Sequence, residues 1–463
     1  MAGVRSPGAT WKPLDQRDGV VSGTPFLPGE TNISSEQTKS AYVRVDFGRD
    51  DIFGADTALS GNIGLRYAKT DFQTQGFITT PNVGEQFGDA DRNDPRFPGQ
   101  GIRVTQANAA AIARYRCGLI QPGQSGPGYC LLSDARLNDL IAFSDGSTQP
   151  VERTNSYDDW LHSLNVNLKY KEWVFRGAVS RAMTRPDFGV TAFSAGLFYT
   201  DMNQIRANGG DVNTAPLLTT NGGGSLLTGV RAWNYDLGVE WYFKPGSSLT
   251  FNAFYKDLTD ILASGSFVQP FSNAQGVSTD VLVNQQVNIG SGWIKGFEVG
   301  YQQTYTFLPG LLSGLGIEAN YTFVEPSTFP NAVSEPRYAG LELPLQQLSR
   351  HTYNFSVFYE RDRLSARLAY NWRNGFLLTP RDDINPFSPI FNASTGQLDG
   401  SIFYTLNDNW KIGLYGANLL DEVTVTEQQT SYQLNGVNQA GPLAPRSYFR
   451  SDRRVTLSLR YTF

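Results

Sequence analysis

The last eleven residues of the chain, 453–463, alternate strictly between apolar and polar side chains. The apolar set is Val455, Leu457, Leu459, Tyr461 and Phe463, and the residues between them are Arg454, Thr456, Ser458, Arg460 and Thr462. A two-residue period is that of a pleated strand with two unlike faces, and about ten residues tilted near 45° cross the hydrocarbon core of a bilayer. The pattern therefore predicts one strand of a membrane barrel that ends in an aromatic residue.

Similar stretches recur along the whole chain. They predict strands near 39–47, 58–72, 156–171, 173–185, 231–244, 247–261, 281–305, 314–324, 346–361, 364–378, 397–406, 410–427 and 448–463. In one of them Leu237 and Val239 alternate with Asp236, Gly238 and Glu240. Strands of soluble sandwiches average about five or six residues, so about thirteen strands of ten residues or more favour an all-β, antiparallel transmembrane β-barrel.

The connections between these strands alternate in length. Short turns are predicted at 171–173, 244–247, 307–313, 360–363 and 407–410. Long loops are predicted at 71–155, 186–230, 262–280, 325–345, 379–395 and 428–447. Short periplasmic turns and long extracellular loops are typical of an outer-membrane barrel, because its two rims face different compartments.

Composition agrees with β structure and limits the function. Aromatic residues make up 13% of the chain, with 47 Gly and 3 Met, and no apolar run is long enough for a spanning helix. The formal charge is −5 without a cluster of Lys and Arg, which argues against nucleic acid as a partner. The first residues have no apolar segment of the kind a secretory signal needs, so we expect either a processed chain or a fragment.

The motifs, taken in order, carry a resemblance to a known family. They are SRAMTRPDF (180–188), NYDLGVEWYF (234–243), FNAFYKDLTDIL (251–262), IKGFEVGYQQTYTFLPG (294–310), GLGIEANYTFV, LSRHTYNFSVFYERD, LSARLAYNWR, GANLLDE and the closing LRYTF. With these motifs the chain resembles the carboxyl-terminal barrel of a TonB-dependent outer-membrane receptor, of the kind found in Xanthomonas and Caulobacter relatives. The resemblance covers most of residues 1–463.

This resemblance implies an active importer in the outer membrane of a Gram-negative bacterium. Such a receptor has a barrel of about 22 strands, a plug in its lumen, and a segment that binds the TonB complex. The sequence shows neither plug nor TonB box, so residues 1–463 are expected to form the later part of the barrel, as a truncated product or a fragment. An incomplete sheet in lipid would leave two unpaired edges, each of them costly.

The transported solute is expected to be a large nutrient. The subfamily that the chain resembles is often associated with carbohydrate, which favours an oligosaccharide, while a siderophore carrying ferric iron remains the alternative. A passive porin-like channel and a surface protein with hydrolase activity in its loops are further alternatives. No pair of carboxylates indicates catalysis, and neither an enzyme nor a cofactor is predicted.

The predicted ligand-facing residues lie where two strands meet the loop at 186–230. They are Arg185, Asp187, Trp233, Asn234 and Asp236. The alternative is that Arg181, Arg185 and Asp236 form a charge network inside the barrel. Trp160 and Tyr199 are expected either to stack on a sugar ring or, more often, to belong to the aromatic girdle at the membrane surface.

Other motifs point mostly to structural roles. Cys117 and Cys130 are the only cysteines and predict a disulfide that closes a loop. The segment at 89–94 spaces acidic residues like a calcium loop, but Asp94 and Gln100 replace the Gly and Glu that an EF-hand requires. A solvated acidic tip is therefore expected, with a looser calcium site in an outer loop as the alternative. With only two His and no zinc spacing, no metal site is predicted. The glycines near 290–296 and 221–225 match no nucleotide motif and predict turns or bulges.

Overall fold

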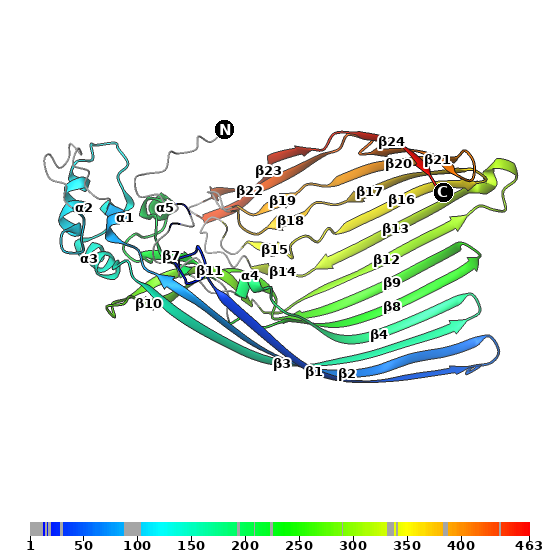
Figure 1. The fold of residues 1–463 in the computed structure, drawn as a ribbon, viewed down its shortest axis with the longest axis horizontal. Helices are drawn as coiled ribbons and strands as arrows, with labels where there is room; N and C mark the ends of the chain where they lie inside the picture. Colours follow the sequence, from blue (N-terminus) through cyan, green and yellow to red (C-terminus); the bar gives the residue numbers. More distant parts are fainter. Residues whose placement is uncertain are drawn as a thin grey trace.

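In this computed structural model, residues 20–27, 31–87, 103–191, 195–207, 209–222, 226–288, 290–330, 341–382, 388–434 and 437–463 are described, together with Pro13, Gln16 and Tyr338. The fold is dominated by one curved antiparallel wall, and a smaller body of helices and strands caps one end of it (Figure 1). None of the described helices has the length and hydropathy that crossing a bilayer would need.

The wall is a sheet whose path runs through thirteen strands in chain order, with the two-residue strand β5 (Ala195–Gly196) paired to one of them. The thirteen strands are β1 (Ile33–Asp50), β2 (Thr57–Thr79), β3 (Thr148–Tyr170), β4 (Trp173–Thr184), β8 (Val230–Lys244), β9 (Ser247–Thr259), β12 (Gly292–Thr304), β13 (Leu315–Pro326), β16 (His351–Arg361), β17 (Leu364–Arg373), β20 (Thr395–Thr405), β21 (Trp410–Ala417) and β24 (Arg454–Tyr461). The all-β, antiparallel class predicted from the sequence is confirmed.

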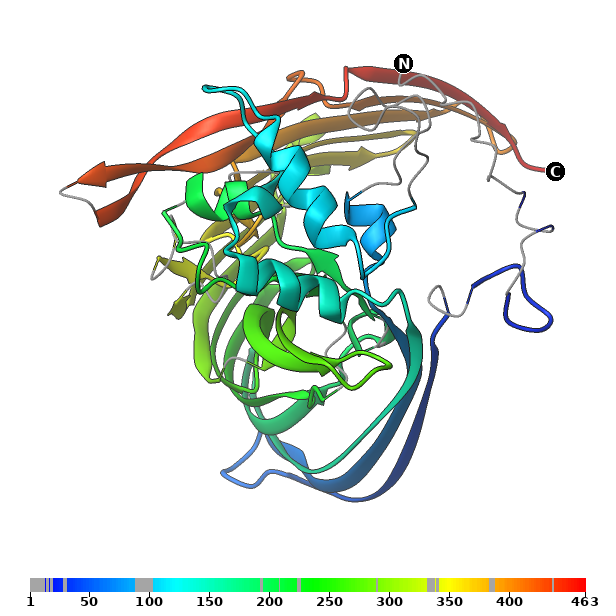
Figure 2. The ribbon, with the colours of Figure 1, turned by 90° about the vertical axis from the view of Figure 1, so that its left-hand side faces the viewer.

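The wall does not close within the described residues. β1 pairs only with β2, and β24 pairs only with β21. Seen along the wall, the sheet is strongly curled and stays open between these two edges (Figure 2). Because all thirteen strands alternate in direction, β1 and β24 run the same way and cannot be antiparallel neighbours. An antiparallel barrel made from this wall therefore needs an odd number of strands between them.

The two faces of the wall differ as the two-residue period requires. On the face that carries Leu237 and Val239, the aromatic rings gather in two rows. The ring pairs are Tyr67 with Trp160, Tyr353 with Trp372, Trp173 with Trp241 and Trp410 with Tyr461, at centroid distances of 4.9, 4.5, 5.2 and 4.8 Å. Trp233 and Trp241 belong to opposite rows of one strand and are about 26 Å apart along it, the scale of the apolar band of a membrane barrel.

Other strands extend or depart from the wall. They are β6 (Phe198–Tyr199), β7 (Leu218–Asn221), β10 (Leu262–Ser272), β11 (Ser278–Asn288), β14 (Thr328–Pro330), β15 (Glu342–Pro344), β18 (Phe376–Thr379), β19 (Ile390–Asn392), β22 (Val423–Leu434) and β23 (Val437–Arg450). The stretch 281–305, predicted as one strand, is two: β11 joins a separate sheet of order β10-β11-β7-β6, and only β12 belongs to the wall. The chain bends between them at Gly290, whose φ of +115° suits glycine.

The cap contains most of the helices. They are α1 (Val83–Phe87), α2 (Ala109–Gly118), η3 (Gly128–Leu131), α3 (Asp134–Phe143) and α5 (Met202–Ala207), while α4 (Phe188–Thr191) lies near the wall and η4 (Gly310–Gly314) lies in a turn. α3 begins after Ser133, whose Oγ accepts a hydrogen bond from the backbone N–H of Arg136. Leu137, Leu140 and Ile141 then fall on one helical face and are buried.

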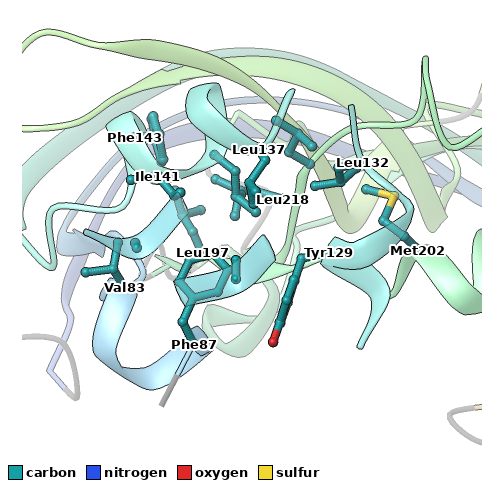
Figure 3. Packing of buried hydrophobic residues seen from close by; sticks show 14 of the residues in the cluster. Val83, Phe87, Tyr129, Leu132, Leu137, Ile141, Phe143, Leu197, Met202 and Leu218 are labelled. Carbon is teal, nitrogen blue, oxygen red and sulfur yellow. The ribbon is translucent and has the colours of Figure 1, made fainter. Parts of the chain in front are cut away.

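Three loops that are far apart in the sequence build the apolar core of the cap. Its members lie between β2 and β3, between β4 and β8, and between β9 and β12. Figure 3 labels members from the first two of these loops. Phe143 and Leu218 are fully buried, and Val281 joins them from β11. β11 also pairs in parallel with β7, which ties the third loop to the second. The three loops therefore form one packed body.

A carboxylate joins the cap to the ends of the wall strands. Asp145 Oδ1 accepts hydrogen bonds from the Thr80 hydroxyl at 2.6 Å and from the backbone N–H of Ser147 at 3.0 Å. Its Oδ2 accepts from the backbone N–H of Ala274 at 3.1 Å, in the β10–β11 hairpin. Burial raises the pKa of Asp145, but these hydrogen bonds outweigh it and hold the pKa below its usual value. Asp145 therefore stays ionised while it links two loops.

An ionic node lies where the wall meets the long loops. Arg231 on β8 pairs with Asp159 on β3 and, at 2.5 Å, with Asp260 just after β9. The side chain of Asp159 is only 1% exposed, and that of Arg231 is 17% exposed. A buried carboxylate requires a partner, so this node fixes the position of three strands at the loop end of the wall.

Cys117 and Cys130 form a disulfide between α2 and η3. The bond closes a short loop of the cap, and both residues pack against the cap core. We expect the Cys117→Ser, Cys130→Ser double variant to lower the stability of the cap by about 3 kcal/mol, because the unfolded loop regains its freedom. Hydrogen exchange of α2 and α3 would measure this. A reducing agent should reproduce the effect in the wild type and change nothing in the double variant.

Candidate functional site

The polar face of the wall holds a hollow of about 800 Å³. Its polar lining residues are Asn165, Asn167, Arg176, Asp236, Asn252, Lys256 and Glu298, from strands β3, β4, β8, β9 and β12. One hollow spanning five neighbouring strands means that the sheet curves toward its polar side. We call this concave side the lumen face. The wall thus curves around a space whose lining mixes these polar side chains with apolar ones, behind an apolar outer surface, as in a membrane barrel.

At one end of the hollow, the positive charge of Arg176 is neutralised by an ion pair with Glu240. Arg176 Nε donates to Glu240 Oε1 at 2.6 Å, and its Nη1 donates to Asn167 Oδ1 at 3.0 Å. The Tyr242 hydroxyl donates to Glu240 Oε2 at 2.7 Å. Arg176 and Glu240 therefore both have their charges compensated by partners within the wall.

The centre of the hollow keeps charged groups that make no ion pair within the described part of the chain. Asp236 and Glu298 are acids, and Lys256 is the base near them. The register places Asp236 opposite Phe254 and Asn234 opposite Lys256. Two carboxylates against one ammonium leave a net negative charge in this part of the lumen face, which disfavours anionic solutes.

The register separates the five predicted ligand-facing residues. Asn234 and Asp236 lie on the lumen face, and Asn234 is within 3.4 Å of the Ser180 hydroxyl oxygen. Trp233 lies on the opposite, apolar face because neighbouring residues of a strand point to opposite sides. There its ring stacks on His162 with centroids 5.8 Å apart. Of the three predicted residues on β8, Asn234 and Asp236 therefore share the lumen face, and Trp233 lies on the opposite face.

Arg185 and Asp187 lie at the start of the long loop after β4. Arg185 pairs with Glu36 on β1 at 2.7 Å and also donates to Thr38. Asp187 accepts from the backbone N–H of Gly189 at 2.8 Å and so caps the short helix α4. Both residues have local structural partners, and their contact with a solute stays a prediction.

The alternative charge network is not formed as predicted. Arg185 pairs with Glu36 on β1. The register pairs Arg181 with Trp233 on the apolar face, whereas Asp236 lies on the lumen face. An ion pair between Arg181 and Asp236 would have to pass through the sheet.

Two aromatic residues that were candidates for sugar stacking have other surroundings. Trp160 lies on the apolar face against Tyr67, as the girdle interpretation predicts. Tyr199 lies in the cap, where its hydroxyl donates to Ser144 Oγ at 2.8 Å, so it belongs to neither the girdle nor the lumen.

The calcium-like segment 89–94, with Gln100, and residues 223–225 of the glycine-rich stretch lie outside the described residues. Elsewhere in the described chain no group of three possible ligands could hold a metal ion.

Several residues that line the hollow are not among those predicted from the sequence. Asn252, Phe254 and Lys256 alternate along β9 and share the lumen face with Glu298 of β12. Their two-residue spacing in the stretch FNAFYKDLTDIL was visible, but the neighbouring strand that completes the hollow was not. Only the register between strands shows which polar positions meet.

The wall, its apolar outer face and its polar hollow define a protein of the transmembrane β-barrel class. The model of the family "TonB dependent receptor-like, beta-barrel" matches residues 3–419. The chain belongs to this family of receptors and transporters, whose barrels reside in the outer membrane of Gram-negative bacteria. No curated protein matches the chain.

Solved structures of similar fold include three bacterial receptors. The siderophore receptor PirA from Acinetobacter baumannii is 14% identical, with a TM-score of 0.44, and the match covers 93% of this chain and 55% of PirA. The ferric yersiniabactin uptake receptor FyuA from Yersinia pestis is 14% identical, with a TM-score of 0.47 and coverages of 93% and 46%. The ferric-catecholate import receptor Fiu from K12 E. coli is 13% identical, with a TM-score of 0.46 and coverages of 93% and 45%. The chain thus spans about half the length of these receptors.

Proposed function

We propose that this chain forms part of the barrel of an outer-membrane importer that the TonB complex energises. The segregation of short and long connections, the apolar outer face and the polar hollow support a channel wall between two aqueous compartments. Family membership supports import rather than catalysis. The TonB complex would act on a segment of the receptor other than this wall.

The open edges of the wall support a larger barrel. β1 and β24 each have a free edge within the described residues, and unpaired backbone groups cost several kcal/mol in lipid. Residues 1–463 are therefore proposed as the later part of a barrel whose remaining strands pair with both edges. A second copy in the same membrane orientation would offer only strands that run parallel to these edges, so it does not restore an antiparallel barrel.

The proposed solute is a neutral oligosaccharide. The observation that supports it is the hollow, where Asp236, Glu298 and Lys256 leave a net negative charge among amide side chains. Hydroxyl groups donate to carboxylates and exchange hydrogen bonds with Asn165 and Asn252. A ferric chelate that carries negative charge would meet repulsion at the same place. A siderophore therefore remains the second candidate, with less support from this site.

We expect Asp236→Asn to weaken binding of a neutral oligosaccharide about tenfold, because a hydrogen bond to a charged acceptor is worth about 1.5–3 kcal/mol. Asp257→Asn is the matched control, since Asp257 is exposed on the apolar face of β9. Changes at Leu237 or Val239 on the apolar face should also leave binding unchanged. Calorimetry with a panel of oligosaccharides and ferric chelates measures these affinities.

Two outcomes would contradict the proposal. Binding of ferric chelates alone would make the second candidate the correct one. Rapid passage of small sugars through the assembled barrel in liposomes, without any energy source, would instead indicate a passive porin. Import that needs the proton gradient and shows saturation would support the proposed receptor.

A further inference from the structure

The outer, apolar face of the wall carries a groove of about 480 Å³ between β1 and β8. We call it the outer groove. Five apolar side chains that line it are 60, 57, 55, 41 and 36% exposed, namely Val43, Val45, Ile63, Leu164 and Val179. Val179 lies opposite Tyr235, which is two residues from Leu237 on the apolar face. The outer groove therefore opens on the side of the wall that faces lipid.

The outer groove begins at the loop end of the apolar band. One row of residues crosses five strands at this level, and its members from β1 to β8 are Val43, Leu65, His162, Arg181 and Trp233. Trp233 belongs to the aromatic row at this end of the band. Leu164 and Val179 pair with each other one row deeper, about 6.6 Å along the strands. The outer groove thus runs from the edge of the band into the hydrocarbon.

Two rings of the outer groove lean toward each other across β4. β3 and β8 are two strand steps apart, about 9.6 Å, yet the rings of His162 and Trp233 stack with centroids 5.8 Å apart. Arg181 is the residue of β4 at the same level. An occupant of the outer groove would therefore meet aromatic surface and a guanidinium together.

The guanidinium of Arg181 makes no ion pair with the part of the chain that the structure describes. A charge at the edge of the hydrocarbon is costly when it stays unpaired, so a long side chain there extends toward the headgroup layer for a partner. A phosphate fits this partner, because it accepts two parallel hydrogen bonds from the planar guanidinium.

Neighbouring acids on the outer face do not supply that partner. Toward the loops, Lys69 lies opposite Lys39 on one side and Asp158 on the other. Its Nζ is 3.4 Å from Oδ1 of Asp71. Asp257 is on β9, two strand steps from β4 and about 10 Å away. The two lysines match the acids near the loops, so the guanidinium on β4 keeps its charge uncompensated.

We propose that the outer groove binds an acyl chain of an anionic lipid of the outer leaflet, whose phosphate pairs with Arg181. The long loops place this end of the band on the extracellular side, where that leaflet lies. A further strand paired with β1 would lie beside it in the sheet and leave the outer groove uncovered. The inference requires the membrane location of the wall and is independent of the solute.

The test uses the complete receptor that contains this chain, in phosphatidylcholine nanodiscs with lipid A as a minor component. Native mass spectrometry counts the lipid A molecules that stay bound to the released receptor. Arg181→Gln should weaken lipid A binding about tenfold, because it removes a charge-assisted hydrogen bond. Val179→Trp should weaken it as well, because the larger side chain fills the outer groove.

Two matched controls lie on the outer face away from the outer groove. Lys295→Gln removes a cation that already pairs with Glu325 at 3.2 Å. Leu368→Trp adds the same ring on β17, where Leu368 is 48% exposed. Neither change should alter lipid A binding.

The unfolding midpoint of each variant is measured beside its lipid affinity. Loss of lipid A in both groove variants, with unchanged midpoints and unaffected controls, would support the site. Phosphatidylglycerol bound with the same dependence on Arg181 would also support it, since its phosphate is anionic too. Equal retention of phosphatidylcholine and lipid A by the wild type, or wild-type affinity in both groove variants, would overturn it. Solute binding should be unchanged in Arg181→Gln, because Arg181 lies outside the lumen, so this site and the proposed function fail separately.

Discussion

Replacing Asp159 by alanine is expected to lower the free energy of unfolding by about 3 kcal/mol. Asp159 is 1% exposed and accepts from Arg231, which would be left in the wall with Asp260 as its remaining partner. Removing one member of a buried pair costs about 3–5 kcal/mol, and the pair with Asp260 places the expected loss at the lower end. Urea unfolding in lipid vesicles, followed by tryptophan fluorescence, measures the change.

The control for this experiment is an exposed ion pair of the same type. Arg44 and Asp46 on β1 pair with side chains 58% and 62% exposed, so Asp46→Ala should cost less than about 1 kcal/mol. A double variant with Asp159→Leu and Arg231→Met should recover much of the loss, because it removes the unpaired charge as well. Equal stability of Asp159→Ala and Asp46→Ala would show that the node does not hold the strands together.

Replacing Phe143 by alanine is expected to destabilise the cap by about 3–5 kcal/mol while leaving the wall folded. Phe143 is fully buried in the core that the three loops share, so its removal leaves a cavity between them. Because that core lies outside the wall, the loss should appear as local opening of α2, α3 and β11. Hydrogen exchange resolved by peptide would show faster exchange in these segments and unchanged exchange in β8 and β9.

Phe198 provides the matched control for the cap. It belongs to the same body but is 62% exposed, so Phe198→Ala should cost less than about 1 kcal/mol. Faster exchange throughout the wall in Phe143→Ala would mean that cap and wall unfold together. Such a result would contradict the view that the cap core is a separate cooperative unit.

The sequence predicted the wall because the signal for it is local. The alternation of Leu237 and Val239 with Asp236 and Glu240 indicates which residues share a face, even when the neighbouring strand is not known. The same rule should have separated Trp233 from Asp236, since they are three positions apart and an odd offset places two residues on opposite faces. Grouping them by nearness in the sequence produced a site that the register does not allow.

The cap was not predicted, because the residues of its core come from three loops that are far apart in the sequence. The long connection between β2 and β3 was expected to be a loop, and the structure shows that it contains α1, α2 and α3. In α3 the apolar residues do have helical spacing, but the core that buries them also needs residues from β7 and β11, which come much later in the chain. The helices therefore owe their stability to packing rather than to intrinsic propensity.

The sequence by itself determined the strand period, the alternation of short and long connections, and the polarity of each face of the wall. The tertiary structure alone decided which polar positions meet in the hollow, which side chains line the outer groove, and how three loops share one core. The physical reason is distance along the chain. A face is set by neighbours two residues apart, whereas Asp159 meets Arg231, and His162 stacks on Trp233, only after strand pairing and packing have fixed the register.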